Sequence, residues 1–214
     1  MTFIPDASTL VAYSIACLVL FITPGPDMSL FLARTMAGGR RLGVASALGA
    51  NVGCVAHTTL AAIGVSALLA ASATGFLVLK IVGALYLLWL AIDAIRNGSA
   101  LNVREGATVN QSFLRTFLMG VGVNLTNPKV VLFFVTFLPQ FVDRADPAAP
   151  EKLFFLGVEF IVISIPLMVL TVLLAEQLTA LPTRSKWVQR ALNYSFAAVF
   201  TGFALVILGA QARH

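Results

Sequence analysis

Long apolar segments alternate with short polar ones along this chain. Six of the apolar segments are long enough, at roughly 20 residues each, to cross the hydrocarbon layer of a bilayer as a helix. They occupy residues 8–33, 42–70, 75–95, 112–141, 153–175 and 192–211. They lack the alternation of apolar and polar residues that is typical of transmembrane strands. The pattern therefore predicts an all-α integral membrane protein with six transmembrane helices.

The composition agrees with a membrane protein. Of the 214 residues, 59% are hydrophobic and 11% are charged, whereas a soluble domain usually has about 25% charged residues. The amino terminus has neither the basic region nor the small-residue cleavage site of a secretory signal peptide. We therefore expect the first apolar segment to remain in the protein as its first span.

Basic residues are concentrated in alternate connections between the spans. The connections after the first, third and fifth spans contain nine of them: Arg34, Arg40, Arg41, Arg96, Arg104, Arg115, Arg184, Lys186 and Arg190. The opposite side has only Arg144, Lys152 and Arg213. Because basic residues near span ends stay in the cytoplasm, we predict that both termini lie outside. This asymmetry accounts for the net charge of +5, and the absence of a basic patch interleaved with aromatic residues argues against a nucleic-acid partner.

The two halves of the chain resemble each other. The segment PDMSLF, which starts at Pro26, matches PKVVLF, which starts at Pro128, and IVGALYLLWLA in the third span parallels FTGFALVILGA in the sixth. Three spans per half is an odd number, so a duplicated unit inserts its second copy upside down. We predict one transmembrane transport domain over residues 1–214, built as two inverted repeats. The repeats cover about 1–98 and 112–214, with a cytoplasmic linker at about 97–111.

Proline motifs interrupt the first and fourth apolar segments. FITPGPDMSLF places Pro26 and Asp27 inside an apolar run, and NPK places Pro128 and Lys129 at the matching position of the other half. Proline breaks a helix, and a charge is costly in an apolar environment. Interrupted segments at corresponding positions of two halves are the best sequence indication of a transporter's substrate site. The sequence therefore predicts that spans one and four are broken at these prolines and form the site.

Four of these features together carry a family resemblance: TPGPD in the first span, the glycine-spaced second span, GALYLLWLA in the third span and NPK in the fourth. The chain resembles the LysE/RhtB family of amino-acid exporters over essentially its full length. The resemblance implies export of amino acids or close derivatives across the bacterial inner membrane, driven by a proton or other ion gradient. The sequence has no nucleophile beside a base, so we expect neither an enzyme nor a bound cofactor.

An amino acid carries an ammonium group and a carboxylate, and the two breaks offer a partner for each. We predict that Asp27 binds the ammonium or a coupling proton, and that Lys129 and nearby backbone amides hold the carboxylate. The alternative is that Asp27 and Lys129 neutralise each other as a structural pair without contacting a ligand. The side chains of Asn124 and Asn127 suit either a substrate or the carbonyls that the break leaves free.

Further polar residues lie within the spans. Asn51 and Thr58 are seven residues apart on one helical face, so we expect them to join the cavity. His57 suits either a proton relay or a hydrogen bond to a neighbour, and Glu159 is either a second proton-linked carboxylate or reaches toward the outer surface. The glycines at 49 and 53 are interpreted as a helix-packing face.

A divalent metal-ion exporter of related architecture is the second hypothesis. Metal ligation requires clustered His, Cys, Asp or Glu side chains, but the spans contain one His and two well-separated cysteines, Cys17 and Cys54. We interpret these cysteines as small core residues. The spans offer few charges to complement a cationic side chain, so we expect neutral amino acids as substrates. Small-residue faces on the helices also permit a homodimer.

Overall fold

The computed structural model describes residues 3–97, 112–143, 146–184 and 186–209, and in these ranges all regular structure is helical. The elements are α1 (Ala7–Ile22), α2 (Pro26–Leu60), the π-helical turn η1 (Ala61–Val65), α3 (Ser66–Ala71), α4 (Ala73–Asn97), α5 (Phe113–Thr126), α6 (Pro128–Leu132), the π-helical turn η2 (Phe133–Phe137), the 3-10 helix η3 (Leu138–Phe141), α7 (Ala149–Leu173), α8 (Ala175–Arg184) and α9 (Lys186–Gly209). Apart from Asn97, the predicted linker at 97–111 lies outside the described residues.

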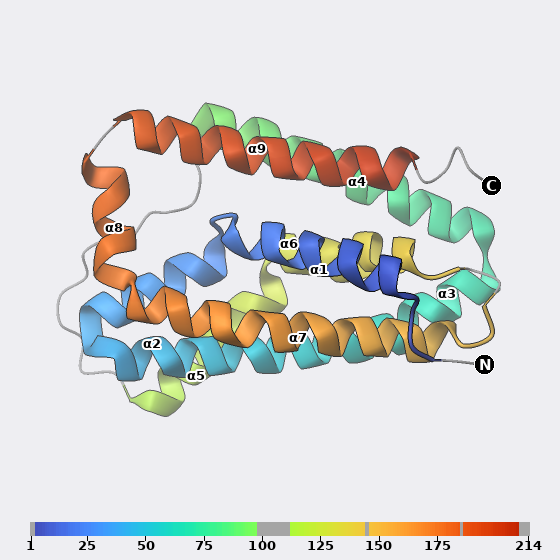
Figure 1. Cartoon of the computed structure of the whole chain (residues 1–214), viewed down its shortest axis with the longest axis horizontal. Coiled ribbons are helices and arrows are strands. Elements are labelled where there is room, and N and C mark those ends of the chain that lie inside the picture. The colour runs from blue at the N-terminus through green and yellow to red at the C-terminus, as the bar shows by residue number, and fades with distance from the viewer. Residues whose placement is uncertain (1–2, 98–111, 144–145, 185, 210–214) are drawn as a thin grey trace.

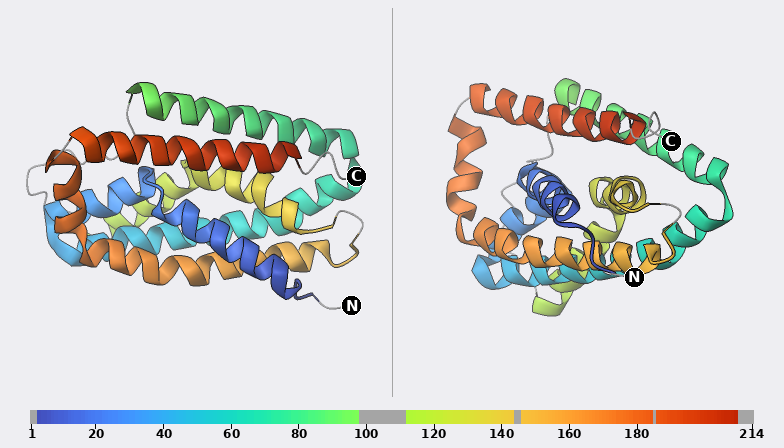
Figure 2. Two further views of the ribbon diagram at one scale, coloured as in Figure 1. Left: turned by 45° about the horizontal axis from the view of Figure 1, so that its top comes forward. Right: turned by 45° about the vertical axis from the view of Figure 1, so that its right-hand side comes forward.

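The helices form three layers (Figures 1 and 2). Helices α4 and α9 lie side by side in one outer layer, and α2, α5 and α7 form the other. Helices α1 and α6 lie between these layers, and α8 connects α7 to α9. The start of α1 and the end of α9 lie at the same end of the molecule, opposite α8 (Figure 1). The middle layer, which contains both predicted breaks, is therefore enclosed by the outer two.

Side-chain caps fix where helices begin. At the start of α1, Asp6 accepts hydrogen bonds from the side chain of Ser8 and from the backbone N–H of Thr9, the latter at 2.9 Å. These hydrogen bonds hold the pKa of Asp6 well below its usual range. At the start of α5, the hydroxyl of Ser112 accepts from the N–H of Arg115 at 3.2 Å. Both residues satisfy backbone donors that the first turn of a helix leaves without partners.

Both predicted breaks are present. Helix α1 ends at Ile22 and α2 begins at Pro26, while α5 ends at Thr126 and α6 begins at Pro128. The stretch from α6 to Phe141 is bent by 50° from α5. Each proline is the first residue of a helix, a position where its missing N–H has no intrahelical partner to lose.

Helix α2 consists of two pieces that meet at a glycine pair. Gly38 and Gly39 have non-helical backbone angles, and the φ of Gly39 is 72°. This left-handed conformation favours glycine over residues with a side chain. The chain changes direction at this point (Figure 1), so the residues before Gly38 continue from the first break and those after Gly39 form the next helix of the bundle.

Four helical stretches are long and apolar enough to cross a membrane: Pro26–Leu68, Ala73–Arg96, Ala149–Leu173 and Arg190–Gly209. A fifth results if Phe113–Thr126 and Pro128–Phe141 form one bent span. Helix α1 has 16 residues and is shorter than a single span requires. By length and composition, the described residues therefore supply four or five spans. The count of six stays a prediction, and it requires that α1 and the first piece of α2 cross the membrane together as one span.

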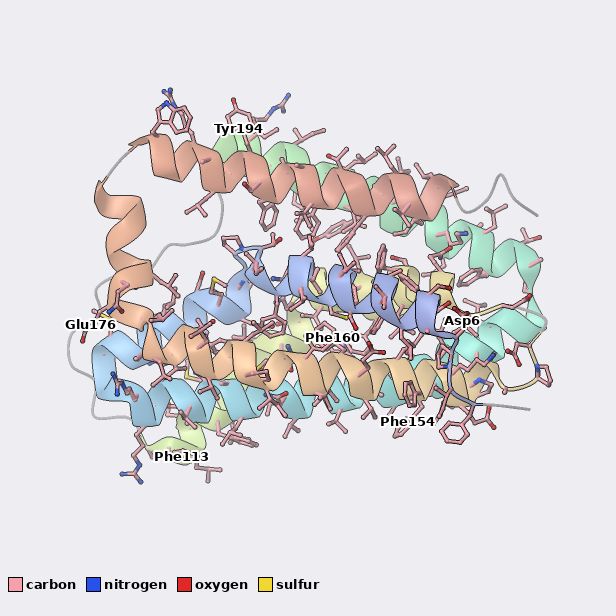
Figure 3. All side chains as sticks on the ribbon, in the orientation of Figure 1. Asp6, Phe113, Phe154, Phe160, Glu176 and Tyr194 are labelled. Atoms are coloured by element: carbon pink, nitrogen blue, oxygen red, sulfur yellow. The ribbon has the colours of Figure 1, made fainter. Side chains whose placement is uncertain are left out.

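Aromatic rings join the three layers. The ring of Phe133 in η2 lies 5.2 Å from that of Phe160 in α7 and 6.2 Å from that of Phe203 in α9, measured between centroids. Figure 3 shows Phe160 inside the bundle, whereas Phe154 and Tyr194 point away from it. Large apolar side chains of this kind on the outside suit contact with lipid rather than with water.

Helices α2 and α5 approach each other closely at glycines. A methyl group on Gly49 would lie 2.0 Å from the carbonyl oxygen of Phe117. One on Gly120 would lie 2.2 Å from the carbonyl oxygen of Ser46, and one on Gly53 would lie 2.3 Å from Oδ1 of Asn124. These contacts confirm that the glycines at 49 and 53 form a packing face.

The α2–α5 contact predicts different effects for two alanine substitutions on one helix. A methyl group at Gly120 meets backbone that cannot move aside, so Gly120→Ala should lower the free energy of unfolding by about 1–3 kcal/mol. A methyl group at Gly122 would meet no neighbouring atom within 4 Å, so Gly122→Ala should leave stability unchanged or slightly raised. Unfolding of the purified variants in detergent measures both values, and equal losses would contradict the close-contact account.

Candidate functional site

The side chain of Lys129 links the two breaks. Its ammonium donates hydrogen bonds to the carbonyl oxygens of Thr23, at 2.8 Å, and Leu20, at 3.1 Å. The carbonyl of Leu20 lies four residues before Pro24, which has no N–H to offer it. These carbonyls are at the carboxyl end of α1, where the helix dipole favours a cation. Lys129 is only 8% exposed, so the end of α1 supplies the stabilisation that water would otherwise give its charge.

Gly25 packs closely against the end of the Lys129 side chain. A methyl group on Gly25 would lie 3.2 Å from Nζ of Lys129 and 3.3 Å from its Cε. The backbone of Gly25 is extended, with φ −171° and ψ −177°, a conformation open to any residue. Glycine is therefore favoured here because the ammonium group packs against the backbone.

Asp27 lies in the first turn of α2, where the positive end of the helix dipole favours a carboxylate. Its Oδ2 accepts a hydrogen bond from Nδ2 of Asn124 at 2.8 Å. Its Oδ1 is buried and has no hydrogen-bond partner. One carboxylate oxygen is thus held by the neighbouring helix, and the side chain of Asn127 also interacts with this carboxylate.

Asp27 and Lys129 line one cavity between the breaks. In the part of the chain that the structure describes, no ion pair within 4.0 Å joins the two. The two charges are close enough to interact electrostatically across the cavity, so both expectations for this pair stay predictions.

The cavity has a volume of about 20 Å³, which is enough for one water molecule. An amino acid can occupy it only if the lining side chains move apart, and methionine side chains change shape readily. Its walls come from α1, α2, α5, α6 and α7. They consist of Leu20, Phe21, Asp27, Met28, Phe31, Cys54, Asn124, Lys129, Val130, Phe160, Met168 and Thr171.

Asn124 is the hub of a small hydrogen-bond network. While its amide donates to Asp27, its Oδ1 lies 3.7 Å from the thiol of Cys54 and its backbone carbonyl lies 3.3 Å from Nε2 of His57. The ring of His57 also stacks on that of Phe134. His57 therefore has the neighbouring hydrogen bond that was one of its two expected roles.

Asn127 and the two prolines shape the starts of the second half-helices. Pro26 and Pro128 begin α2 and α6, and Asn127 caps α6 by accepting a hydrogen bond from the N–H of Lys129 at 3.1 Å. The Nδ2 of Asn127 is buried without a hydrogen-bond partner. Asn127 also interacts with the carboxylate of Asp27 through its side chain.

Asn51 and Thr58 lie in the interface between α2 and α7, outside the cavity wall. Nδ2 of Asn51 donates to the sulfur of Met168 at 2.8 Å, and its Oδ1 accepts from Ser164 at 3.1 Å. Thr58 packs so tightly on Gly157 that a methyl group there would lie 2.4 Å from its Cγ2. The structure thus differs from the expected polar line into the cavity, and Asn51 reaches the cavity wall only through Met168.

Glu159 also lies outside the cavity wall. Its Oε1 accepts a hydrogen bond from Ser14 at 2.6 Å, which joins α7 to α1. Its Oε2 and the hydroxyl of Tyr13 are both buried without hydrogen-bond partners. The side chain is therefore held inside the bundle rather than extended toward the surface.

The apolar part of the cavity wall was not foreseen from the sequence. Phe31, Phe160, Met168 and Thr171 lie in segments where nearly every position is apolar or small, so no periodic signal distinguishes them. Met28 and Val130 had a sequence signal, because they follow Asp27 and Lys129 directly in the two breaks.

Broken helices that meet at a cavity are typical of secondary transporters. Two broken segments in a helical membrane bundle meet at one cavity, and many secondary transporters form their substrate sites from discontinuous helices of this kind. Among the described residues, no three His, Cys, Asp or Glu side chains are grouped closely enough to hold a metal ion.

Comparison with known proteins identifies the family. Residues 18–211 match the LysE type translocators, and the chain belongs to this family of membrane transport proteins. It is 32% identical over 203 residues to a homoserine/homoserine lactone efflux protein of Salmonella typhimurium, covering 95% of this chain and 96% of the relative. It is 28% identical over 194 residues to a leucine efflux protein of Klebsiella pneumoniae, covering 90% and 91%. An uncharacterized membrane protein of Vibrio cholerae is 30% identical over 209 residues, covering 97% and 100%. No solved structure matches the chain.

Two buried lysines allow a matched test of the link between the breaks. Lys129→Met removes both donors to the end of α1 and should lower the free energy of unfolding by about 2–5 kcal/mol. Lys80 is likewise 8% exposed, but it lies near the start of α4, less deep in the bundle than Lys129, and its ammonium faces the ring of Phe76 at 5.7 Å. Lys80→Met should therefore lower the free energy of unfolding much less in the same assay. Equal decreases for the two variants would mean that the carbonyl contacts of Lys129 add no stability of their own.

Proposed function

We propose that this protein is a secondary active exporter of amino acids with six spans in two inverted repeats. In this arrangement α1 and the first piece of α2 form the first broken span, and α5 with α6, η2 and η3 forms the fourth. The proposal is supported by the matched breaks, by the pairing of α4 with α9 as corresponding third spans, and by the start of α1 and the end of α9 lying at one end. The chain would lie in the bacterial inner membrane with both termini outside, as the basic residues indicate.

The observation that carries the proposal is the pair of opposite charges facing one cavity without an ion pair between them. Once the lining side chains move apart, Oδ1 of Asp27 can accept a hydrogen bond from the ammonium of an amino acid. A lysine ammonium has three donors, and two of those on Lys129 are engaged by carbonyls. The third remains for the carboxylate of the substrate, so each end of a zwitterion has a partner.

The substrates are amino acids with uncharged side chains. The cavity wall has no charged side chain besides Asp27 and Lys129, and these two are assigned to the common ends of the amino acid. A cationic side chain would therefore have no counter-charge in the wall. The named relatives agree on the side chain, because homoserine and leucine both have uncharged side chains, whereas homoserine lactone has no free carboxylate for Lys129 to hold.

Proton antiport follows from the same carboxylate. An ionised Asp27 attracts the substrate ammonium, whereas a protonated Asp27 has lost that attraction and releases it. If the cavity opens alternately to the cytoplasm and the outside, a proton bound from outside replaces the amino acid and returns with Asp27 to the cytoplasm. The exchange moves one amino acid outward for each proton that moves inward at this site.

Substitution of Asp27 tests this function. In proteoliposomes loaded with leucine or homoserine and given a proton gradient, Asp27→Asn should lower export at least about thirtyfold, because removing one buried charged partner costs roughly 2–5 kcal/mol. The remaining transport should no longer respond to pH. Asp93→Asn, a carboxylate on α4 outside the cavity wall, is the matched control and should retain export and its pH dependence.

Two results would contradict the proposal in different ways. Full uphill export by Asp27→Asn with unchanged pH dependence would remove the carboxylate from coupling. No export of any neutral amino acid by the unmodified protein, together with efflux of a divalent metal ion from the same vesicles, would favour the metal-exporter hypothesis instead.

A further inference from the structure

A second, larger cavity adjoins the charged one. It lies between the end of α1, the first turns of α2, the end of α7, α8 and α9, and has a volume of about 270 Å³. Ten of its eleven lining residues are apolar, among them Leu32, Leu167, Leu170 and Leu178, and the remaining one is Thr171. Its wall has no charged side chain. Chemically, this space suits a hydrocarbon group.

The two cavities share one wall. Phe21, Met28 and Thr171 line both. The hydroxyl of Thr171 donates to the carbonyl of Leu167 at 2.8 Å, so its donor is satisfied within its own helix. Met28 is unbranched and flexible. A rearrangement of this side chain, which directly follows Asp27 in the chain, would join the charged cavity to the apolar one.

We propose that the larger cavity receives the aliphatic side chain of the amino acid whose ammonium and carboxylate are bound by Asp27 and Lys129. This inference rests on the proposed function and adds the determinant of substrate choice. The charged cavity, at about 20 Å³, has no room for the side chain of the substrate. Because the two cavities share a wall, that side chain can extend into the larger one. Neutral aliphatic side chains gain from burial there, whereas a lysine or arginine side chain would place its charge among ten apolar residues.

A homologous series of substrates measures this burial. Alanine, 2-aminobutyrate, norvaline and norleucine differ by one methylene at a time, and each buried methylene should lower the half-saturation concentration about fourfold. Each radiolabelled amino acid is assayed for export from proteoliposomes containing the full chain. The expected result is a stepwise fall along the series.

Two neighbouring positions on α7 provide the matched variants. Leu170 lines the apolar cavity, whereas Val169 does not, and they are similarly exposed at 49% and 47%. Leu170→Trp fills the cavity, so it should raise the half-saturation concentration for norleucine at least about tenfold, with a smaller effect on alanine. Val169→Trp should leave the slope of the series as it is in the unmodified protein.

The outcomes separate this inference from the proposed function. A flat series in a protein that still exports these amino acids in an Asp27-dependent manner would overturn the side-chain cavity alone, and would assign that space to a lipid acyl chain. A stepwise series that Leu170→Trp and Val169→Trp alter equally would also overturn it. Absence of export of all four amino acids by the unmodified protein would instead remove the proposed function on which the inference rests.

Discussion

The ammonium of Lys129 on the carbonyls of Leu20 and Thr23 is the contact on which the arrangement of the site depends. A proline break leaves carbonyls without helical partners, and in the interior of a bilayer no water is present to satisfy them. Lys129 comes from the start of the second break and satisfies the end of the first. This one interaction satisfies a carbonyl that the first break leaves without a partner and stabilises the buried charge at the second break. It also holds the two breaks next to each other.

The other half of the site is held by close helix packing. Gly53 allows α2 to approach α5 at Asn124, and Asn124 in turn holds one oxygen of Asp27. Each charged residue thus follows a proline in one broken segment and reaches across to the last turn of the other. In this reciprocal arrangement both charged residues line the same cavity, and two of the three donors of Lys129 are engaged by carbonyls.

The breaks and the helical class followed from the sequence because proline and charge inside apolar runs have strong, local physical consequences. The packing role of Gly49 and Gly53 followed from their spacing of four residues, because small residues at this spacing let two helices approach closely. The partners of Lys129 did not, since backbone carbonyls carry no sequence signal and depend on how two distant segments dock. Helical periodicity predicts which residues share a face of a helix, but not which element packs against that face. The face of Asn51 packs against α7, although the sequence predicts that it lines the cavity. The apolar walls, including Phe160 and Met168, were hidden for a related reason: nearly every neighbouring position is apolar as well.

The central claim is that the two breaks together recognise both ends of a zwitterion. Calorimetric binding to the purified protein tests it most directly, with leucine compared against 4-methylpentanoate, which lacks the ammonium, and 3-methylbutylamine, which lacks the carboxylate. The account predicts that leucine binds and that each analogue binds at least about a hundredfold more weakly, because each leaves a buried charge of the site without its partner. Binding of either analogue as tight as that of leucine would contradict it.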